Sequence, residues 1–342
     1  EQMPAFSLDS GSVAKLSSDA RGALRADAAT TLASVYLNLG VLSAQAGRFS
    51  RASDLMQEGA ALDPALPSLQ YSLGVVCFNA QQYDRAAPAL ERALAADPQN
   101  ADARRMLALA SLHTQAFARA AELLRNDPEL QRNASLQYAY GVALVHSGHA
   151  TDAERLFSSL LASHTDDPQL TLLLGQARAE QGDYDGAVAT LQHALALKAD
   201  LADANRTMGV IYMKQGKLPE AAAALRAELA SHPDDLAARS TLATVLDMSG
   251  NQAQAREELA RVLRARPNDA DARYLLGKIL LAGGSATDAV EHLEIAARLA
   301  PKDANIHYQL GQAYQKLGRA ADAQREFDRF QQLKADRRGG GS

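Results

Sequence analysis

The feature that most constrains the fold is a repeat of about 34 residues through nearly the whole chain. A small residue, glycine or alanine, recurs at steps of 34, 34 and 33 residues and then five times at 34, and an alanine follows each one twelve residues later. Such a period indicates an array of stacked structural units rather than one globular core. The nine small residues are Gly40, Gly74, Ala108, Gly141, Gly175, Gly209, Ala243, Gly277 and Gly311.

Each unit is predicted to be a pair of antiparallel helices. Apolar residues recur at spacings of three and four, which is the pattern of a helix with one buried face. A break follows, often at a glycine such as Gly47 or Gly182, and a second apolar stripe ends in five units at a proline such as Pro64. A helix pair of this size cannot bury both faces alone, so the pairs must stack. The sequence therefore predicts an all-α fold, an α-solenoid.

This pattern resembles the tetratricopeptide repeat (TPR) family in its small residues, its final proline and its period. The resemblance runs from about Ala33 to Arg337 and implies a right-handed superhelix of helix pairs. The chain departs from the family in two ways: the aromatic residue of the fourth position occurs only as Tyr36, and tryptophan is absent.

The expected domain organisation is an N-terminal segment, one solenoid and a short tail. Residues 1–32 should carry a capping helix over Ser12–Ala29, and residues 338–342 look like a flexible linker or tag scar. The third repeat is one residue short, and Pro128 arrives early in it, so its second helix should be truncated and the segment Asn126–Asn133 should be a loop. The solenoid, 33–337, divides into 33–66, 67–100, 101–133, 134–167, 168–201, 202–235, 236–269, 270–303 and 304–337.

Composition argues against several classes of protein. The chain has 35 Lys and Arg against 40 Asp and Glu, so it lacks the basic excess of a nucleic-acid-binding protein. Its longest apolar stretches, such as Tyr138–Val145, fall far short of the roughly 20 residues that span a bilayer. The single cysteine, Cys77, permits no internal disulfide, and its place near Gly74 predicts a buried thiol.

No motif of catalysis or cofactor binding occurs in the sequence. It contains no glycine-rich phosphate loop and no nucleophile elbow. His113 and His146 share one repeat position, and His149 follows one turn later, so the three are candidate metal ligands. No carboxylate is clearly placed to complete such a set. We therefore expect polar helix ends here, no metal site and no cofactor.

In proteins that the chain resembles, the first helices line a concave groove that binds peptide segments or helices. At the fifth, ninth and twelfth positions, repeats one to four are mainly apolar, whereas repeats seven to nine are mainly polar. An exposed apolar patch usually marks a contact site, although a tight superhelix would bury these residues instead. The candidate groove residues are Leu37, Val41, Tyr71, Val75, Phe78, Arg105, Leu109, Leu112, Tyr138, Val142, Val145, Arg206, Tyr274 and Tyr308.

The leading hypothesis is a non-enzymatic protein–protein interaction scaffold that binds a partner peptide or helix in the groove of repeats one to four. One alternative is the repeat region of a longer enzyme or assembly subunit whose catalytic domain is absent, and another is a self-associating array. Arginine outnumbers lysine by 27 to 8, as is typical of GC-rich bacterial genomes. The compartment stays open between the bacterial cytoplasm and, if a signal peptide was removed, the periplasm or exterior.

Overall fold

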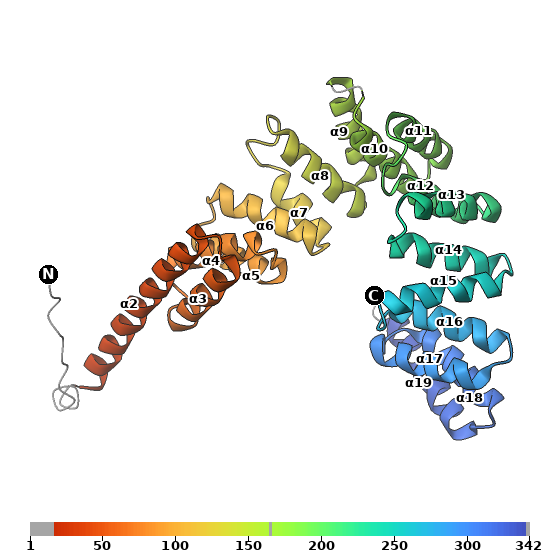
Figure 1. Ribbon diagram of the computed structural model, residues 1–342. Helices are drawn as coiled ribbons and strands as arrows, with labels where there is room; N and C mark the ends of the chain where they lie inside the picture. The colour runs from red at the N-terminus through yellow and green to blue at the C-terminus, as the bar shows by residue number, and fades with distance from the viewer. Residues whose placement is uncertain (1–16, 164–165, 340–342) are drawn as a thin grey trace. The chain divides into compact units, whose positions relative to one another are not determined.

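The computed structural model describes residues 17–163 and 166–339, and every regular element in these ranges is an α-helix (Figure 1). The chain divides into two compact units, Glu1–Ser159 and Leu160–Ser342, which are described separately. None of the described helices is long and apolar enough to cross a membrane.

Unit 1 alternates first and second helices of successive pairs. Each helix from α2 to α7 contacts the next one along the chain, and α8 meets α9 where Gly141 lies beside Phe157. Its helices are α2 (Ser18–Gln45), α3 (Phe49–Leu62), α4 (Pro67–Asn79), α5 (Tyr83–Ala96), α6 (Ala101–His113), α7 (Phe117–Leu124), α8 (Ala134–His146) and α9 (Ala150–Ser163), which runs past the unit boundary.

Unit 2 continues the same alternation, again with contacts between helices that follow each other. Its helices are α10 (Pro168–Glu180), α11 (Tyr184–Leu197), α12 (Ala204–Lys214), α13 (Leu218–Ser231), α14 (Leu236–Met248), α15 (Gln252–Ala265), α16 (Ala270–Ala282), α17 (Ala286–Leu299), α18 (Ala304–Lys316) and α19 (Ala320–Gly339).

The periodic small residue is where the two helices of a pair approach most closely. A Cβ added to Gly74 would lie 2.6 Å from the Leu90 side chain, and one added to Gly141 would lie 2.3 Å from Cζ of Phe157. Real Cβ atoms do not come that close to other heavy atoms, because the interior is already filled at van der Waals contact. The apolar residue sixteen positions later thus occupies the volume that the small residue leaves free.

Successive pairs are joined through the third, seventh and tenth positions of each first helix. These residues face the second helix of the preceding pair, as the close approach of Leu69 to Gly59 illustrates. In α4, α6, α8, α12, α14, α16 and α18 all of them except Tyr140 are at most 9% exposed. The buried set is Leu69, Leu73, Val76, Ala103, Leu107, Ala110, Leu136, Ala143, Ala204, Met208, Ile211, Ala238, Leu242, Val245, Ala272, Leu276, Ile279, Ile306, Leu310 and Ala313.

A polar contact between the loop and the next first helix recurs at six of these junctions. The fourth residue of the helix donates a side-chain hydrogen bond to the backbone carbonyl six residues earlier, which belongs in most cases to the loop proline. The bond satisfies a carbonyl beyond the end of the preceding helix, where no backbone partner is available. The pairs are Gln70 to Pro64, Arg104 to Pro98, Gln137 to Gln131, Arg239 to Pro233, Arg273 to Pro267 and His307 to Pro301.

The turn inside each pair places one residue in the left-handed region of backbone space. Seven of the nine equivalent positions are glycines with φ between 72° and 86°, whereas Gln81 and Gln115 adopt φ of 59°. An L-residue with a side chain is disfavoured in this region by about 1–2 kcal/mol. These two glutamines therefore retain strain that the other turns avoid.

Replacing Gln81 or Gln115 with glycine should raise the free energy of unfolding by about 0.5–1 kcal/mol. The relief of strain exceeds the extra entropy that glycine gains in the unfolded chain. Equilibrium urea unfolding measures the change. The reverse substitution Gly250→Gln is the matched control and should destabilise the chain, and an unchanged or lower midpoint for both glycine variants would contradict the prediction.

The N-terminal region differs from the expected capping helix. Residues 12–16 lie outside the described part of the chain, and Ser18–Ala29 form the exposed start of α2 rather than a separate helix over the first repeat. The reason is local, because the stretch from Ala28 to Ala33 contains no proline or glycine that would end a helix. A single 28-residue helix results.

The shortened third repeat has the predicted form. Its second helix, α7, has eight residues, whereas the second helices on either side of it, α5 and α9, have 14. Residues 126–133 connect α7 to α8 without a regular helix. Asn133 ends this loop and caps α8 by accepting a hydrogen bond from the Leu136 amide at 3.1 Å.

Candidate binding surface

In each unit the first helices form an inner layer. In unit 1, α2 contacts α4, α4 contacts α6 and α6 contacts α8, while the second helices α3, α5 and α7 make no comparable contacts with one another. The same relation joins α10, α12, α14, α16 and α18 in unit 2. The predicted groove residues lie on these inner helices.

Unit 1 presents most of its predicted groove residues at least partly to solvent. Tyr138 is 40% exposed and Val41 is also exposed. Val145 is a correction, since it is only 3% exposed and lies in the core beside Ala143 and Leu144. The end of α8 is thus covered on several sides, so Val145 offers no surface to a partner. The partly exposed members are Leu37, Tyr71, Val75, Phe78, Arg105, Leu109, Leu112 and Val142.

Phe78 belongs to an aromatic cluster that joins three helices. Its ring lies 5.3 Å from that of Tyr83 at 74° and 6.2 Å from that of His113. Tyr83 and His113 are stacked at 3.9 Å with an interplanar angle of 4°. Edge-to-face and stacked pairs at these distances are stabilising. Phe78 therefore helps to fix α4, α5 and α6 and presents only part of its ring to solvent.

The histidines that were weighed as metal ligands have other contacts. His146 lies 4.5 Å from the ring of Phe117, which repeats the relation of His113 to Tyr83 in the next helix pair. His149 places Nδ1 3.0 Å from the Ser147 hydroxyl. The signal for these stacks was present in the sequence, where an aromatic residue at the seventeenth position is followed by a histidine at the thirteenth position of the next repeat.

Arg105 is held by a carboxylate of its own chain. Its Nε and Nη2 donate to the two oxygens of Asp127 at 2.8 and 3.2 Å, and Nη1 lies 3.3 Å from Asp102. Asp127 has a fully buried side chain and also accepts from the Glu129 amide. The hydrogen bond to Asp127 raises the pKa of the Arg105 guanidinium. A two-bond pair of this kind is strong and directional, so Arg105 anchors the loop that replaces the truncated helix.

Arg206, in unit 2, is also held within the chain. It forms an ion pair with Asp203, and its Nε lies 3.2 Å from the Asp235 carboxylate. Burial alone would lower the pKa of the Arg206 guanidinium, but its hydrogen bond to Asp203 and the neighbouring carboxylate charges raise it overall. Both predicted groove arginines are therefore structural anchors.

A buried glutamate completes this network at the start of α12. Glu228 is almost fully buried and accepts from the backbone amides of Asp203 and Arg206 at 3.0 and 3.2 Å. Glu228, which belongs to α13, therefore caps the N-terminus of α12. Its negative charge also interacts favourably with the positive end of the α12 helix dipole. His232 lies 3.0 Å from the same carboxylate.

The oxygens of Asp203, Glu228 and Asp235 lie within 4.8 Å of one another, as metal ligands do. Arg206 already contributes a cation to this group, and two of the acids serve helix ends, since Asp235 caps α14 through the Ala238 amide. The arrangement is accounted for by charge neutralisation and helix capping.

Comparison with known families decides what this array is. Profiles described as "Tetratricopeptide repeat" match residues 71–130, 212–279 and 304–337, and one described as "TPR repeat" matches 175–216 and 277–318. The chain belongs to the tetratricopeptide repeat family. No curated protein matches the sequence significantly.

Several solved structures are similar to this TPR chain, and the one with a TM-score above 0.5 has the same fold. The APC/C hetero-tetramer Cut9–Hcn1 matches at 17% identity and a TM-score of 0.55, over 84% of this chain and 56% of that one. MamA from Desulfovibrio magneticus RS-1 matches at 21% identity and a TM-score of 0.47, over 49% and 96%. YrrB, described as a TPR protein with an unusual peptide-binding site, matches at 20% identity and 0.47, over 53% and 93%.

The inner helices of the TPR repeats in unit 2 carry a more polar surface. Tyr308 is exposed, but its ring lies 5.1 Å from Phe330, and its hydroxyl accepts from the Gln312 amide group at 3.0 Å. Burial raises the pKa of the Tyr274 hydroxyl. Lys278 pairs with the Asp247 carboxylate at 2.9 Å. Polar and charged groups therefore lie beside Tyr308 and Lys278 on this surface.

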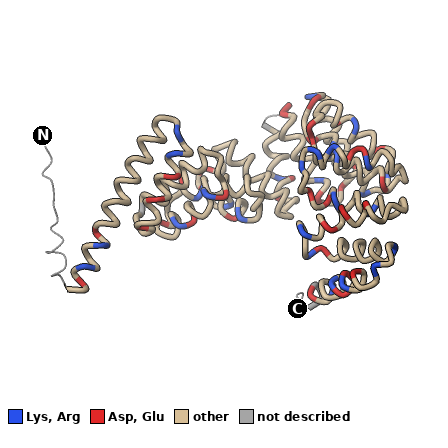
Figure 2. Tube along the Cα trace, turned by 60° about the horizontal axis from the view of Figure 1, so that its bottom comes forward, with Lys and Arg blue, Asp and Glu red and all other residues tan. Residues whose placement is uncertain are grey.

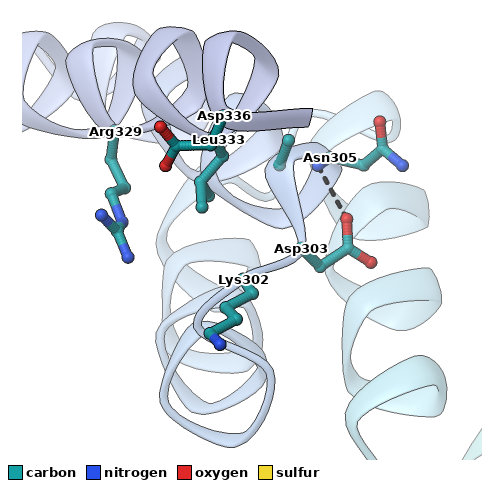
Figure 3. A pocket seen from close by; sticks show the side chains of 7 residues that line it. Lys302, Asp303, Asn305, Arg329, Leu333 and Asp336 are labelled. Carbon is teal, nitrogen blue, oxygen red and sulfur yellow. Dashed lines mark hydrogen bonds between the residues drawn. The ribbon is translucent and has the colours of Figure 1, made fainter. Parts of the chain in front are cut away.

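An open hollow lies beside the last TPR helix pair (Figure 3). Lys302 and Arg329 lie on its rim together with the carboxylates of Asp303 and Asp336. Asp303 accepts from the Asn305 amide at 2.8 Å and so caps α18. The hollow has balanced charges and no convergent set of donors, which is typical of a solvated end of the array.

Cys77 has the environment expected from the sequence. Its side chain is fully buried in the first hydrophobic cluster of unit 1. Burial raises the pKa of the Cys77 thiol. A thiol with this environment is an inert part of the core.

Proposed function

We propose that the chain is an interaction scaffold that binds a peptide segment or amphipathic helix of a protein partner. The contact surface is the inner face of α4, α6 and α8 in unit 1. Its anchors are Tyr71 and Tyr138, with Val75, Leu109 and Val142 between them, and Leu37, Val41 and Leu112 extend it. The nine repeats expected over 33–337 supply the framework.

The observation that supports this proposal is the exposure of Tyr138 on an apolar inner face. Tyr138 is 40% exposed, and the ninth-position residues Val75, Leu109 and Val142 of α4, α6 and α8 are apolar and only partly buried. Tyrosines bury a large area with few rotatable bonds to fix, so they contribute strongly to binding energy. The corresponding positions of unit 2 include Thr244, Lys278 and Gln312, which suit a peptide anchor less well.

The proposal is a binding function rather than catalysis. Among the described residues, the cluster of acids around Glu228 is neutralised by Arg206 and caps helices. Cys77 is buried, and burial raises the pKa of its thiol. These groups serve the fold and leave the exposed inner face as the surface available for a partner.

Selection from a displayed library of apolar and amphipathic peptides, followed by measurement of Kd, tests the proposal. The double variant Tyr71→Ala/Tyr138→Ala should bind selected peptides at least about 30-fold more weakly, because each tyrosine contributes more than about 1 kcal/mol. Helicity should be unchanged, since both side chains are partly exposed.

The matched control is Tyr274→Ala/Tyr308→Ala, which removes two tyrosines from the same repeat positions in unit 2. It should retain the affinity of the parent chain. Equal loss in both double variants, or binding that survives the unit 1 changes, would place the contact surface elsewhere.

A further inference from the structure

Within the part of the chain that the structure describes, α2 leaves a junction surface without a partner. In α2 the third, seventh and tenth repeat positions are Val35, Leu39 and Leu42, and Leu32 precedes them on the same stripe. These four side chains are 45–61% exposed. In the later first helices of each unit the same three positions are almost entirely buried against the preceding second helix. The α2 stripe is therefore a surface that this fold normally closes with an antiparallel helix.

The opposite side of α2 packs against α3. Gly40 lies against the Met56 side chain of α3, and Ala33 is fully buried. No charged residue occurs between Asp27 and Arg48, and Figure 2 shows most of α2 in tan, without blue or red. An uncovered apolar stripe of this length marks a contact site.

The spacing of the stripe identifies a suitable occupant. The apolar residues of the stripe, with an alanine at each end, are spaced 4, 3, 4, 3 and 4 positions apart from Ala28 to Ala46. This spacing is the same in both directions along the helix. A two-fold axis near Leu37 would set alanine against alanine at the ends and leucine against leucine inside them. The stripe residues are Ala28, Leu32, Val35, Leu39, Leu42 and Ala46. A self-complementary patch of this kind is what an isologous dimer requires.

We propose that α2 pairs with α2 of a second copy of this chain in antiparallel orientation. The interface brings Val35 of one copy against Leu39 of the other, and Leu32 against Leu42. Both helices then bury the stripe that a preceding repeat would otherwise cover.

The charges at the two ends of the stripe are complementary in this arrangement. Asp27 and Arg48 are exposed, and neither has an ion-pair partner within the described ranges. Antiparallel pairing about Leu37 places Asp27 of each copy beside the turn that carries Arg48 of the other. Opposite charges at the rim of an interface fix its orientation more than its strength.

Head-to-tail stacking on the last helix fits less well. The side of α19 that would meet another repeat carries Phe330, at the position where Gly59 and Ala93 are buried, and its ring already lies 5.1 Å from that of Tyr308. Pairing through α2 alone joins helices of 28 residues, about 42 Å long. An interface of that length lies at the small end of the range, below about 1,200 Å² in total, which predicts a reversible dimer that depends on concentration.

Light scattering after size exclusion, over a series of concentrations, tests the proposal. The parent chain should approach twice its 36.4 kDa mass as its concentration rises. Leu39→Glu places a charge at the centre of the interface and should give the monomer mass throughout, with unchanged helicity by circular dichroism. Met248→Glu is the matched control, because Met248 is equally exposed on a first helix of unit 2, and it should dimerise like the parent.

Cysteine cross-linking tests the orientation. Cys77 is fully buried, so introduced thiols react alone. The double variant Leu32→Cys/Leu42→Cys should form a covalent dimer under mild oxidation, whereas Leu32→Cys alone should not, because antiparallel pairing separates the two identical positions by about 15 Å along the helix. A parent chain that stays monomeric, which would leave the stripe to a helix of another protein, overturns the proposal. So does a dimer that Leu39→Glu leaves intact.

Discussion

Replacing Arg105 with methionine should lower the free energy of unfolding of unit 1 by about 3 kcal/mol. Methionine keeps much of the packing volume but leaves the Asp127 carboxylate buried without its partner, and an uncompensated buried charge is strongly destabilising. The bidentate contact at 2.8 and 3.2 Å is the main neutralising interaction of that carboxylate. Equilibrium urea unfolding followed by circular dichroism gives the change in midpoint.

The control for this prediction removes both charges. Arg105→Met/Asp127→Asn should recover much of the lost stability, since the neutral amide no longer needs a cation. A double-mutant cycle then gives the coupling energy of the pair. Arg105→Met with parent-like stability would show that the loop after α7 is held by other contacts.

Replacing Gly141 with alanine should destabilise the same unit by about 2–3 kcal/mol. The added Cβ would lie 2.3 Å from Cζ of Phe157, whose ring is fully buried and has no space to move into. Overpacking of a filled core costs energy of this size. It exceeds the gain of up to about 1 kcal/mol that alanine normally brings to a helix interior. The midpoint of thermal or urea unfolding reports the effect.

Gly22→Ala serves as the comparison. Gly22 also lies inside a helix, but nothing stands within 4 Å of its Cβ position, so alanine should be neutral or stabilising there. If both variants behaved alike, the close approach of α8 and α9 could not be the reason for glycine at position 141.

The helix pairs could be predicted from the sequence because the determining contacts are periodic. Gly74 with Leu90 and Gly141 with Phe157 stand at one fixed spacing, so a single geometric rule covers every repeat. The short α7 was equally predictable, since Pro128 and the missing residue act within a few positions along the chain.

The roles of individual groove residues depended on contacts that spacing alone does not fix. Arg105 donates a hydrogen bond to Asp127, which is 22 residues away in the irregular loop after α7. Arg206 forms an ion pair with Asp235 of the following repeat. Both had been placed on the groove because each stands at a groove position. The burial of Val145 was likewise not predictable from spacing, because it depends on the tertiary packing around the end of α8. Peptide binding at Tyr71 and Tyr138 stays a prediction.

The N-terminal region was misjudged for a different physical reason. The sequence predicts a separate helix over Ser12–Ala29 that would cover the first repeat. Helix propensity continues without a break through Ala28 and Ala33, however, so Ser18–Gln45 form one continuous helix. Local propensity decided the outcome over the tertiary benefit of covering an apolar face.

Because every junction uses the third, seventh and tenth positions of a first helix, whole repeats are interchangeable in evolution. Duplication or loss of one 34-residue unit rejoins surfaces that already match, so such an array can change length without redesign of its interior. A single-residue insertion within a helix would instead rotate the following stripe by about 100° and expose it. The third repeat tolerates its missing residue because the loss falls where α7 gives way to a loop. Lengthening and shortening by gene recombination is thus built into the geometry, whereas small insertions are confined to the connecting turns.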